Sequence, residues 1–251
     1  MSVNPASLPL SGIRVIELGH SVAAPYAGLV LAELGAEVVK VEKPGKGDDA
    51  RGWGPPFVSG ESAYFMSVNR NKESLTLDFK HPDGRALLER LIARADVLVE
   101  NFRPGAMDKL GFGYADLKAL KPELVYCSLK GFLPGPYDHR TGLDEVVQMM
   151  GGLAYMTGGR FGPLRAGASV NDVMGGVFGA VEYFQDSSTP NVIMVEPREV
   201  GASILNELEG LASRLGAFPA VRHVAPGLPF AVPNTKSTPA SCNRNAQSRP
   251  C

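Results

Sequence analysis

Asp172 is the side chain best placed for chemistry in this chain, because an apolar helix containing Gly175 and Gly176 is expected to begin beside it. The free N–H groups and the dipole at the start of a helix stabilise a carboxylate. An aspartate with an ordinary pKa of about 3.9 is ionised at pH 7, so Asp172 is a candidate for chemistry that needs a carboxylate. A plain helix cap fits the same pattern, so the spacing alone leaves both roles open.

A second group of candidates consists of basic and amide side chains that follow the expected strands. Each of them alone is typical of a solvated surface charge. Because ligands of parallel α/β sheets bind at the carboxyl ends of the strands, together they predict a cleft for a polyanion. Charge-assisted hydrogen bonds contribute about 1.5–3 kcal/mol each where water is excluded, which suits a phosphate-bearing ligand. The group comprises Lys43, Lys46, Arg70, Lys72, Asn101, Arg103 and Lys130.

The segment 10–51 provides the frame for both groups. Residues 13–18 alternate between apolar and polar side chains and predict a strand, residues 25–34 have helical spacing, and residues 37–42 predict the next strand. Two strands joined by such a helix form a parallel, right-handed βαβ unit with its ligand loops after the strands. The first of these loops lacks the GxGxxG pattern, which disfavours a nicotinamide or flavin enzyme.

The alternation of strands and helices continues along the chain. It predicts an α/β fold with a Rossmann-like, mostly parallel sheet and helices on both faces. A turn over residues 81–84 is expected to precede one of the helices. The further strands are expected at 74–79, 96–100 and 124–129, and the further helices at 85–94, 106–110 and 114–120.

The composition excludes several classes of protein. The 251 residues carry a formal net charge of −1, without the basic excess of a general nucleic-acid binder. Three cysteines show neither metal-ligand spacing nor a disulfide framework, so we expect no metal site and a reducing, cytoplasmic location. No segment is typical of a signal peptide or a membrane span, so no membrane partner is expected.

Residues 214–251 differ from the rest of the chain. They contain no Asp or Glu, five Arg or Lys and six prolines. A segment of this composition cannot bury enough apolar surface to fold, so a disordered basic tail is predicted. Its scattered charges give little support to a nucleic-acid or membrane arm.

Several motifs occur along the chain in an informative order: LSGIRV at 10–15, LGAEVVKVE at 34–42, GD at 47–48, NRNK at 69–72, ENFRPG at 100–105, GFGY at 111–114 and a glycine-rich stretch at 167–175. Over residues 8–181 they resemble the class III coenzyme A (CoA) transferases, the CaiB/BaiF type that includes formyl-CoA transferase. This resemblance implies the large Rossmann-like domain of that family, here incomplete.

The resemblance implies that Asp172 is the nucleophile of an acyl-CoA:carboxylate CoA-transferase. Asp172 would attack the acyl-CoA thioester to give an acyl anhydride, which the CoA thiolate would convert to an aspartyl-CoA thioester. A small carboxylic acid, such as the dicarboxylates succinate or glutarate, would then accept CoA. The family binds no permanent cofactor, since CoA and acyl-CoA are its substrates.

Other family positions imply how CoA is bound. His20, Ser21 and Ala23 would lie around the thioester end, and backbone amides near them or near Asp172 would hold the oxyanion. No metal ligand is implied. The positions implied for CoA binding are Lys43, Lys72, Asn101, Phe102, Lys109 and Lys130.

A racemase is the alternative reaction on the same fold. The α-methylacyl-CoA racemases abstract a proton with a histidine and an aspartate, and tend to have Gly-His-Asp where this chain has Gly142-Leu143-Asp144. The missing histidine favours the transferase, although His139 lies nearby in the sequence and could substitute.

The remainder of the chain departs from the family. We expect residues 8–181 to be the N-terminal CoA-transferase domain, 182–213 an atypical βα segment of foreign origin, and 214–251 the disordered tail. The family forms interlocked homodimers, which a truncated chain is not expected to complete. A non-catalytic remnant is therefore the second hypothesis for this protein.

Overall fold

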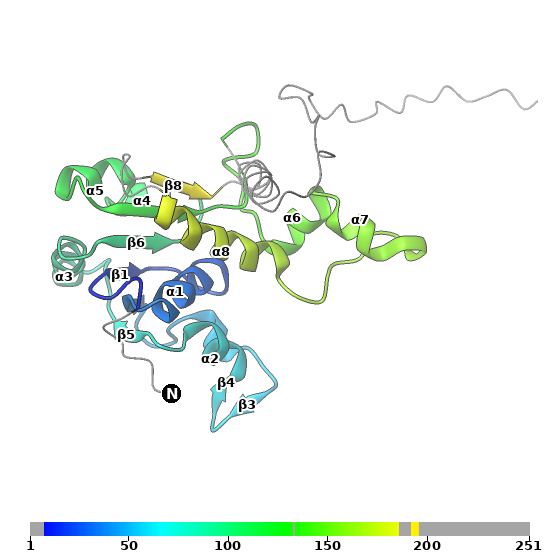
Figure 1. Cartoon of the computed structure of the whole chain (residues 1–251), viewed down its shortest axis with the longest axis horizontal. Coiled ribbons are helices and arrows are strands. Elements are labelled where there is room, and N and C mark those ends of the chain that lie inside the picture. The colour runs from blue at the N-terminus through cyan, green and yellow to red at the C-terminus, as the bar shows by residue number, and fades with distance from the viewer. Residues whose placement is uncertain (1–7, 133, 186–191, 196–251) are drawn as a thin grey trace, which may run out of the picture. The chain divides into compact units, whose positions relative to one another are not determined.

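A parallel sheet forms the centre of the computed structural model, which describes residues 8–132, 134–185 and 192–195. Within these ranges, six strands lie in the order β5-β2-β1-β6-β7-β8, and every neighbouring pair is parallel (Figure 1). This arrangement confirms the predicted Rossmann-like α/β fold. The strands are β1 (Arg14–Glu17), β2 (Glu37–Glu42), β5 (Glu73–Thr76), β6 (Val97–Glu100), β7 (Val125–Leu129) and β8 (Val192–Val195).

Helices alternate with these strands, and two of them begin earlier than the sequence predicted: α1 starts at Ala23 and α3 at Pro82. Helix α3 starts at Pro82 with His81 as its N-cap, whereas a turn was expected over 81–84. Proline loses no hydrogen bond at the first helical position, so the expected turn is the first turn of the helix. The α-helices are α1 (Ala23–Glu33), α2 (Ala63–Asn69), α3 (Pro82–Ile92), α4 (Ala106–Leu110), α5 (Tyr114–Leu120), α6 (Asp144–Met150), α7 (Leu153–Gly158) and α8 (Val170–Gln185).

Both faces of the sheet are covered, because successive strand residues point to opposite sides. Val15 and Val99 pack on one side against α1 and α8. Ile16 and Leu98 pack on the other side against α3, α4 and α5. The helix residues of these clusters include Leu31 of α1 and Ala180 of α8 on the first side, and Leu88 of α3, Met107 of α4 and Leu117 of α5 on the second.

The order of the strands reverses between β1 and β6. Chain progression runs from β1 outwards to β2 and β5 on one side, and from β6 outwards to β7 and β8 on the other. In open α/β sheets, the crevice at such a reversal binds ligands at the carboxyl ends of the strands. The loops that follow β1 and β6 are therefore the ones to examine for a site.

Smaller elements complete the described ranges. A short antiparallel pair, β3 (Phe57–Val58) and β4 (Glu61–Ser62), forms a separate sheet, and two 3-10 helices are η2 (Asp49–Gly52) and η3 (Gly159–Phe161). Large apolar side chains are exposed on α7 and η3, with Tyr155 75%, Met156 74% and Phe161 82% exposed. None of the helices described is both long and apolar enough to cross a membrane.

The expected boundary at residue 181 falls inside α8, which continues to Gln185. Strand β8 lies within the expected βα segment and pairs with β7. Residues 196–213 and the expected tail at 214–251 lie outside the described residues. The division into three regions stays a prediction.

Candidate active site

The turn between β1 and α1 lies at the reversal of the sheet and is tied to the loop after β6. The N–H of His20 donates to Oδ1 of Asn101 at 3.0 Å, and Nδ2 of Asn101 donates to the carbonyl oxygen of His20 at 2.9 Å. Glycine is required at position 19, because a Cβ there would lie 2.2 Å from the Cβ of Ala24 and 3.1 Å from Oδ1 of Asn101. Asn101 and the turn thus form one unit.

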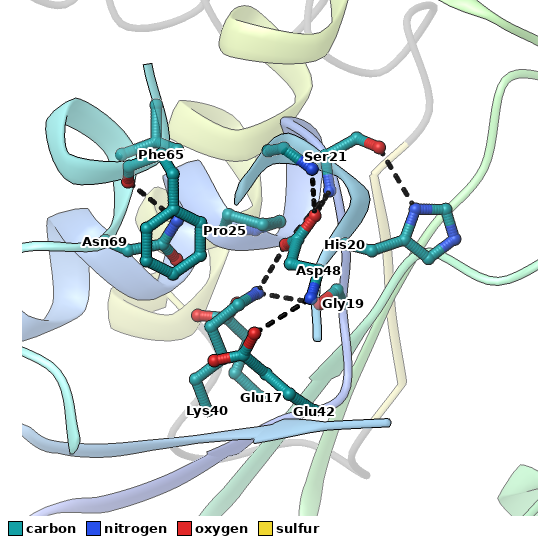
Figure 2. Close-up of polar contacts among 12 residues, drawn as sticks. Glu17, Gly19, His20, Ser21, Pro25, Lys40, Glu42, Asp48, Phe65 and Asn69 are labelled. Atoms are coloured by element: carbon teal, nitrogen blue, oxygen red, sulfur yellow. Dashed lines mark hydrogen bonds and ion pairs between the residues drawn. The ribbon is translucent and has the colours of Figure 1, made fainter. Parts of the chain in front are cut away.

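Ser21, the next residue of the turn, has a positive φ of 66°. This left-handed conformation costs a non-glycine residue about 1–2 kcal/mol, so the surroundings must hold it. The carboxylate of Asp48 accepts the N–H of Ser21 at 3.0 and 3.2 Å, and Lys40 lies 2.9 Å from Asp48 on its other side (Figure 2). The expectation that amides of this turn hold an oxyanion is therefore not met at His20 or Ser21, whose N–H groups have protein acceptors.

The loop after β6 is held by a buried carboxylate of its own. Glu100 accepts the N–H of Phe102 at 2.7 Å, and Nζ of Lys130 lies 2.7 Å from Oε1 of Glu100. The same ammonium donates to the carbonyl oxygen of Phe102 at 2.7 Å, and the Lys130 side chain remains 18% exposed. Lys130 therefore fixes this loop and still reaches the neighbouring cavity.

Asp172 lies in a cavity of about 430 Å³ next to these loops. It stands in the first turn of α8, as the sequence predicted. The cavity brings Asp172 together with three other expected site residues, Ala23, Asn101 and Lys130. The remaining lining consists of Leu129, Gly131, Gly142, Val147, Gly151, Leu153, Asn171, Met174, Gly175 and Phe178.

Asp144 holds the helix that carries Asp172, a role that the sequence analysis missed. Its Oδ1 accepts the N–H groups of Asn171 at 2.9 Å and Asp172 at 3.4 Å. Its other oxygen accepts from Gln148 and lies 3.2 Å from Nη2 of Arg165. Asp144 thus caps the N-terminus of α8 from a different helix, and the sequence alone offered no sign of this contact.

The environment of Asp172 changes its acidity. Burial, together with the carboxylates of Asp144 and Glu145, raises the pKa of Asp172 from 3.8 to about 6, against a smaller opposing effect of Arg165. The expectation of an ordinary pKa is therefore corrected. At pH 7 a group with this pKa is still about nine-tenths ionised, and it is more basic than an ordinary aspartate.

A second cavity of about 320 Å³ lies at the ends of β1 and β2. It brings together His20, Lys43 and Phe102, and the rings of His20 and Phe102 are 5.8 Å apart. Partial burial lowers the pKa of His20 below 6.5, and the carboxylate of Asp48 opposes this shift. Gly19 and His20 line this cavity, and Ala23 and Asn101 line the first, so the turn and the start of α1 border both cavities.

The other expected site residues lie apart from these cavities. The side chain of Lys72 is 2% exposed, and its ammonium contacts Glu17 at 2.8 Å and donates to three more oxygens of the protein. Lys109 is exposed on α4 and lines neither cavity, and Ser21 contributes its Oγ to a 3.1 Å contact with His20. His139, the residue that could make this site a racemase, has a side chain 70% exposed and does not line the cavity of Asp172.

Comparison of the chain with known families gives a match. The model of CoA-transferase family III covers residues 10–184 of the chain. The chain belongs to CoA-transferase family III. This match confirms the resemblance to the family that the motifs indicated.

Individual relatives agree with this assignment. The chain is 46% identical over 172 residues to succinyl-CoA:glutarate CoA-transferase of Mus musculus and 48% identical over 178 residues to succinate--glutarate CoA-transferase of Agrobacterium fabrum. Each alignment covers 68% of this chain but only 39% and 44%, respectively, of the relative. A CaiB/BaiF family protein from Brucella suis has a similar structure, with a TM-score of 0.71, 38% identity, and coverage of 84% of this chain and 59% of that one.

Proposed function

We propose that this chain transfers CoA from an acyl-CoA to a short carboxylic acid, with Asp172 as the nucleophile. The observation that carries the proposal is Asp172 itself, whose carboxyl lies in a cavity with Asn101 and Lys130 and has a pKa raised to about 6. The relatives named for glutarate and succinyl-CoA support a dicarboxylate as acceptor. The chain spans about two fifths of the length of these relatives, at 39–44% coverage, so the activity is a proposal for this chain.

The proposed reaction forms two kinds of covalent intermediate on Asp172 and regenerates its carboxylate at the end. A carboxylate oxygen of Asp172 attacks the thioester carbon, the C–S bond breaks, and an acyl aspartyl anhydride and a CoA thiolate form. The thiolate attacks the aspartyl carbon, which releases the first carboxylate and leaves an aspartyl-CoA thioester. The acceptor carboxylate then repeats these two steps in reverse order, so that it leaves as its CoA thioester and Asp172 is regenerated.

The raised pKa of Asp172 lowers the energetic difficulty of the first step. A thiolate leaving group, with a pKa of about 8.5 by analogy with cysteine, is more basic than an ordinary aspartate by about 4.6 units, or about 6 kcal/mol. With an Asp172 pKa of about 6, the gap falls to about 2.5 units, or about 3 kcal/mol. Binding of the remote nucleotide end of CoA can offset the remainder.

We assign the two cavities to the two ends of CoA. The thioester end would lie with Asp172, Ala23 and Asn101, and the nucleotide end with Lys43 and Phe102. The side chain of Lys43 is 55% exposed, and its ammonium pairs with exposed Asp49 at 2.6 Å, so a phosphate could compete for it. Ser21 and His20 would separate the thioester end of CoA from its nucleotide end. Lys130 would face the thioester end, and Lys109 would contact CoA outside the two cavities. Lys72 would act through Glu17, because protein oxygens surround its ammonium.

The N-terminus of α1 is the better candidate for the oxyanion. Ala23 begins α1 and lines the cavity of Asp172. The N-cap residue Val22 makes no side-chain hydrogen bond to this helix, and Pro25 has no N–H, so the N–H groups of Ala23 and Ala24 are the candidates to meet a developing negative charge. We also expect the protein to work in a reducing compartment such as the cytoplasm, where the free thiol of CoA persists.

Label exchange tests the proposal. The purified chain would be incubated with acyl-CoAs and isotopically labelled short carboxylic acids, beside the Asp172→Ala variant. Asp116→Ala is a matched control, because Asp116 is an exposed aspartate in the first turn of another helix, α5. We expect label to enter the CoA ester pool with the wild type and with Asp116→Ala, and not with Asp172→Ala.

Three other outcomes would each revise the proposal in a defined way. Exchange by Asp172→Ala would remove Asp172 from its proposed role. Wild-type chain that binds CoA without exchange would indicate a non-catalytic remnant. Loss of a proton from the α-carbon without exchange would indicate a racemase.

A further inference from the structure

Lys40 is a fully buried lysine in the middle of the sheet, with a side chain only 1% exposed. Its ammonium contacts three oxygens at similar distances: Oε1 of Glu17 at 2.8 Å, the carbonyl oxygen of Gly19 at 2.8 Å and Oδ2 of Asp48 at 2.9 Å. An ammonium has three protons, so each of them has an acceptor. One of these acceptors belongs to the backbone of the turn that borders the two cavities.

Lys40 also acts on the turn through Asp48. The same Asp48 carboxylate that contacts Lys40 accepts the N–H of Ser21, whose φ is positive (Figure 2). Glu17 and Asp48 raise the pKa of Lys40 although burial alone would lower it, and contacts with Lys40 help to lower the pKa of Asp48. Both partners are therefore charged at neutral pH, and both ends of the turn are anchored to one ion pair.

The surrounding cluster is electrically balanced. It links Glu17, Glu42 and Asp48 to Lys40, Lys72 and Arg51 through contacts of 2.7–2.9 Å. The backbone accommodates it, because a Cβ on Gly28 of α1 would lie 2.1 Å from Oε2 of Glu17. Replacing buried ion pairs by apolar side chains is often neutral or stabilising, so stability alone does not explain these charges. These charges instead fix the orientation of the Lys40 ammonium and the Asp48 carboxylate, the two groups that hold the turn.

We propose that Lys40, with Asp48, is a positioning residue for CoA binding: it fixes the Gly19–Ser21 turn at the border of the two cavities. This inference rests on the proposed function. Lys40 lines neither cavity, since its ammonium has its three acceptors within the protein. Asp48 lines the second cavity, but its side chain is 1% exposed and its carboxylate is taken up by Lys40 and the N–H of Ser21. The ligand contacts made by His20 and by its partner Asn101 would depend on this support.

The test compares Lys40→Met with a matched lysine elsewhere in the full-length chain. Lys121 is suitable, because its side chain is 11% exposed, it donates to the carbonyl oxygen of Ala95, and it lies 4.0 Å from Asp96, just before the amino end of β6. Titration calorimetry would give the Kd and the number of sites for CoA. Amide hydrogen exchange would report on the N–H groups of His20 and Ser21 without any ligand.

For Lys40→Met, we expect the Kd for CoA to rise about tenfold or more and the two amides to exchange faster, because a small misplacement of contact groups is costly. Lys121→Met is expected to keep the Kd within about twofold, since loss of one distant hydrogen bond affects only folding. A variant that was merely partly unfolded would show fewer sites with an unchanged Kd, so a raised Kd is specific to positioning.

Asp48→Asn provides a second variant in case Lys40→Met does not fold. It keeps the shape of the side chain but loses the charge, and we expect the Kd to rise about fivefold, the change that corresponds to one net hydrogen bond. An unchanged Kd in every folded variant, or unchanged amide exchange at His20 and Ser21, would overturn the inference while leaving the proposed function in place. Wild-type chain that fails to bind CoA would overturn both.

Discussion

Charges are arranged in opposite ways in the two regions that support the cavities, which we call the balanced wall and the unbalanced wall. Beneath the β1–α1 turn, three carboxylates are matched by three cations in the cluster centred on Lys40. On the α6–α8 side, the carboxylates of Asp144 and Glu145 raise the pKa of Asp172, and among the described residues Arg165, whose side chain is 39% exposed, is the cation that lowers it. The balanced wall holds backbone in place, and the unbalanced wall raises the pKa of one carboxyl group.

Acidities on the two walls follow this difference. Hydrogen bonds from Arg51, Ser74 and the N–H of Asp48 lower the pKa of Glu42 to about 2, although burial alone would raise it. Burial raises the pKa of Asp172 to about 6, and neighbouring carboxylates add to that effect. The carboxyl of Glu42, which accepts these hydrogen bonds, therefore stays an anion at neutral pH, whereas the carboxyl of Asp172 titrates nearer to neutrality. A nucleophile that must bond to carbon and later leave it belongs in the second wall.

The largest effect is expected when the unbalanced wall loses its nucleophile. Asp172→Asn should reduce label exchange by at least about a thousandfold, or about 4 kcal/mol, because an amide cannot form the anhydride. The same change should stabilise the fold at pH 8 by about 1–3 kcal/mol. The folded-state pKa is raised from 3.8 to about 6, so ionisation of Asp172 disfavours folding above pH 6.

Denaturant unfolding at several pH values would measure this gain. The advantage of Asp172→Asn should shrink as the pH falls from 6 to 3.8, since the wild-type carboxyl is then protonated in the folded state. Asp116→Asn, on the exposed face of α5, is the control and should change neither exchange nor stability by much. A destabilised Asp172→Asn chain would contradict the view that this carboxyl is held under electrostatic stress.

Acid should reduce the free energy of unfolding by a comparable amount, through protonation of a carboxylate in the balanced wall. The pKa of Glu42 is about 2 in the fold against an ordinary 4.5, so its contribution to stability is complete above pH 4.5. That contribution, about 3 kcal/mol, should be lost as the pH falls from 4.5 towards 2. Unfolding midpoints of the wild type and of Glu42→Gln should therefore converge in acid, and a constant difference between them would contradict this assignment.

Removing the cap on α8 should have a smaller effect on stability, and it also tests the role of charge in the unbalanced wall. Asp144→Ala deletes the acceptor of the N–H groups of Asn171 and Asp172, and loss of a helix cap costs about 1–2 kcal/mol. It also removes one of the carboxylates that raise the pKa of Asp172. Calorimetric melting should show the loss of stability, and the pH profile of exchange should shift to lower pH. Glu145→Ala, which should shift the profile without removing the cap, is the control.

How much of this site the sequence could predict depends on whether the residues are local or brought together by the fold. Asp172 at a helix start, and Lys43 and Asn101 at strand ends, follow from periodicity because a parallel sheet collects such positions at one edge. The clamp of Asp144 on α8 could not be predicted, since it joins residues 27 and 28 positions apart through packing. The pKa of Asp172 depends on that same packing.

Lys40 is an intermediate case, because its signal was present in the sequence. It occupies the centre of the expected strand at residues 37–42, and strands inside a parallel sheet are buried on both faces. A lysine there needs a buried anion, and Glu17 at the end of the neighbouring strand offered one. The sequence analysis instead considered lysines in loops, of which Lys72 turned out to be occupied by protein oxygens.

The smallest predicted effect comes from removing the positive charge of Arg165 in the unbalanced wall. Arg165 lies 3.2 Å from Asp144 and lowers the pKa of Asp172 slightly against the nearby carboxylates. Because the guanidinium is partly exposed, Arg165→Met should cost at most about 1 kcal/mol of stability. It should also shift the acid limb of the exchange profile to higher pH, in the opposite direction to Asp144→Ala. The exposed Arg70, which pairs with Glu33 on the surface, is the matched control, and Arg70→Met should leave the profile in place. If neither Arg165→Met nor Asp144→Ala shifted the profile, the pKa of Asp172 would be set by burial alone, and charge imbalance would not distinguish the two walls.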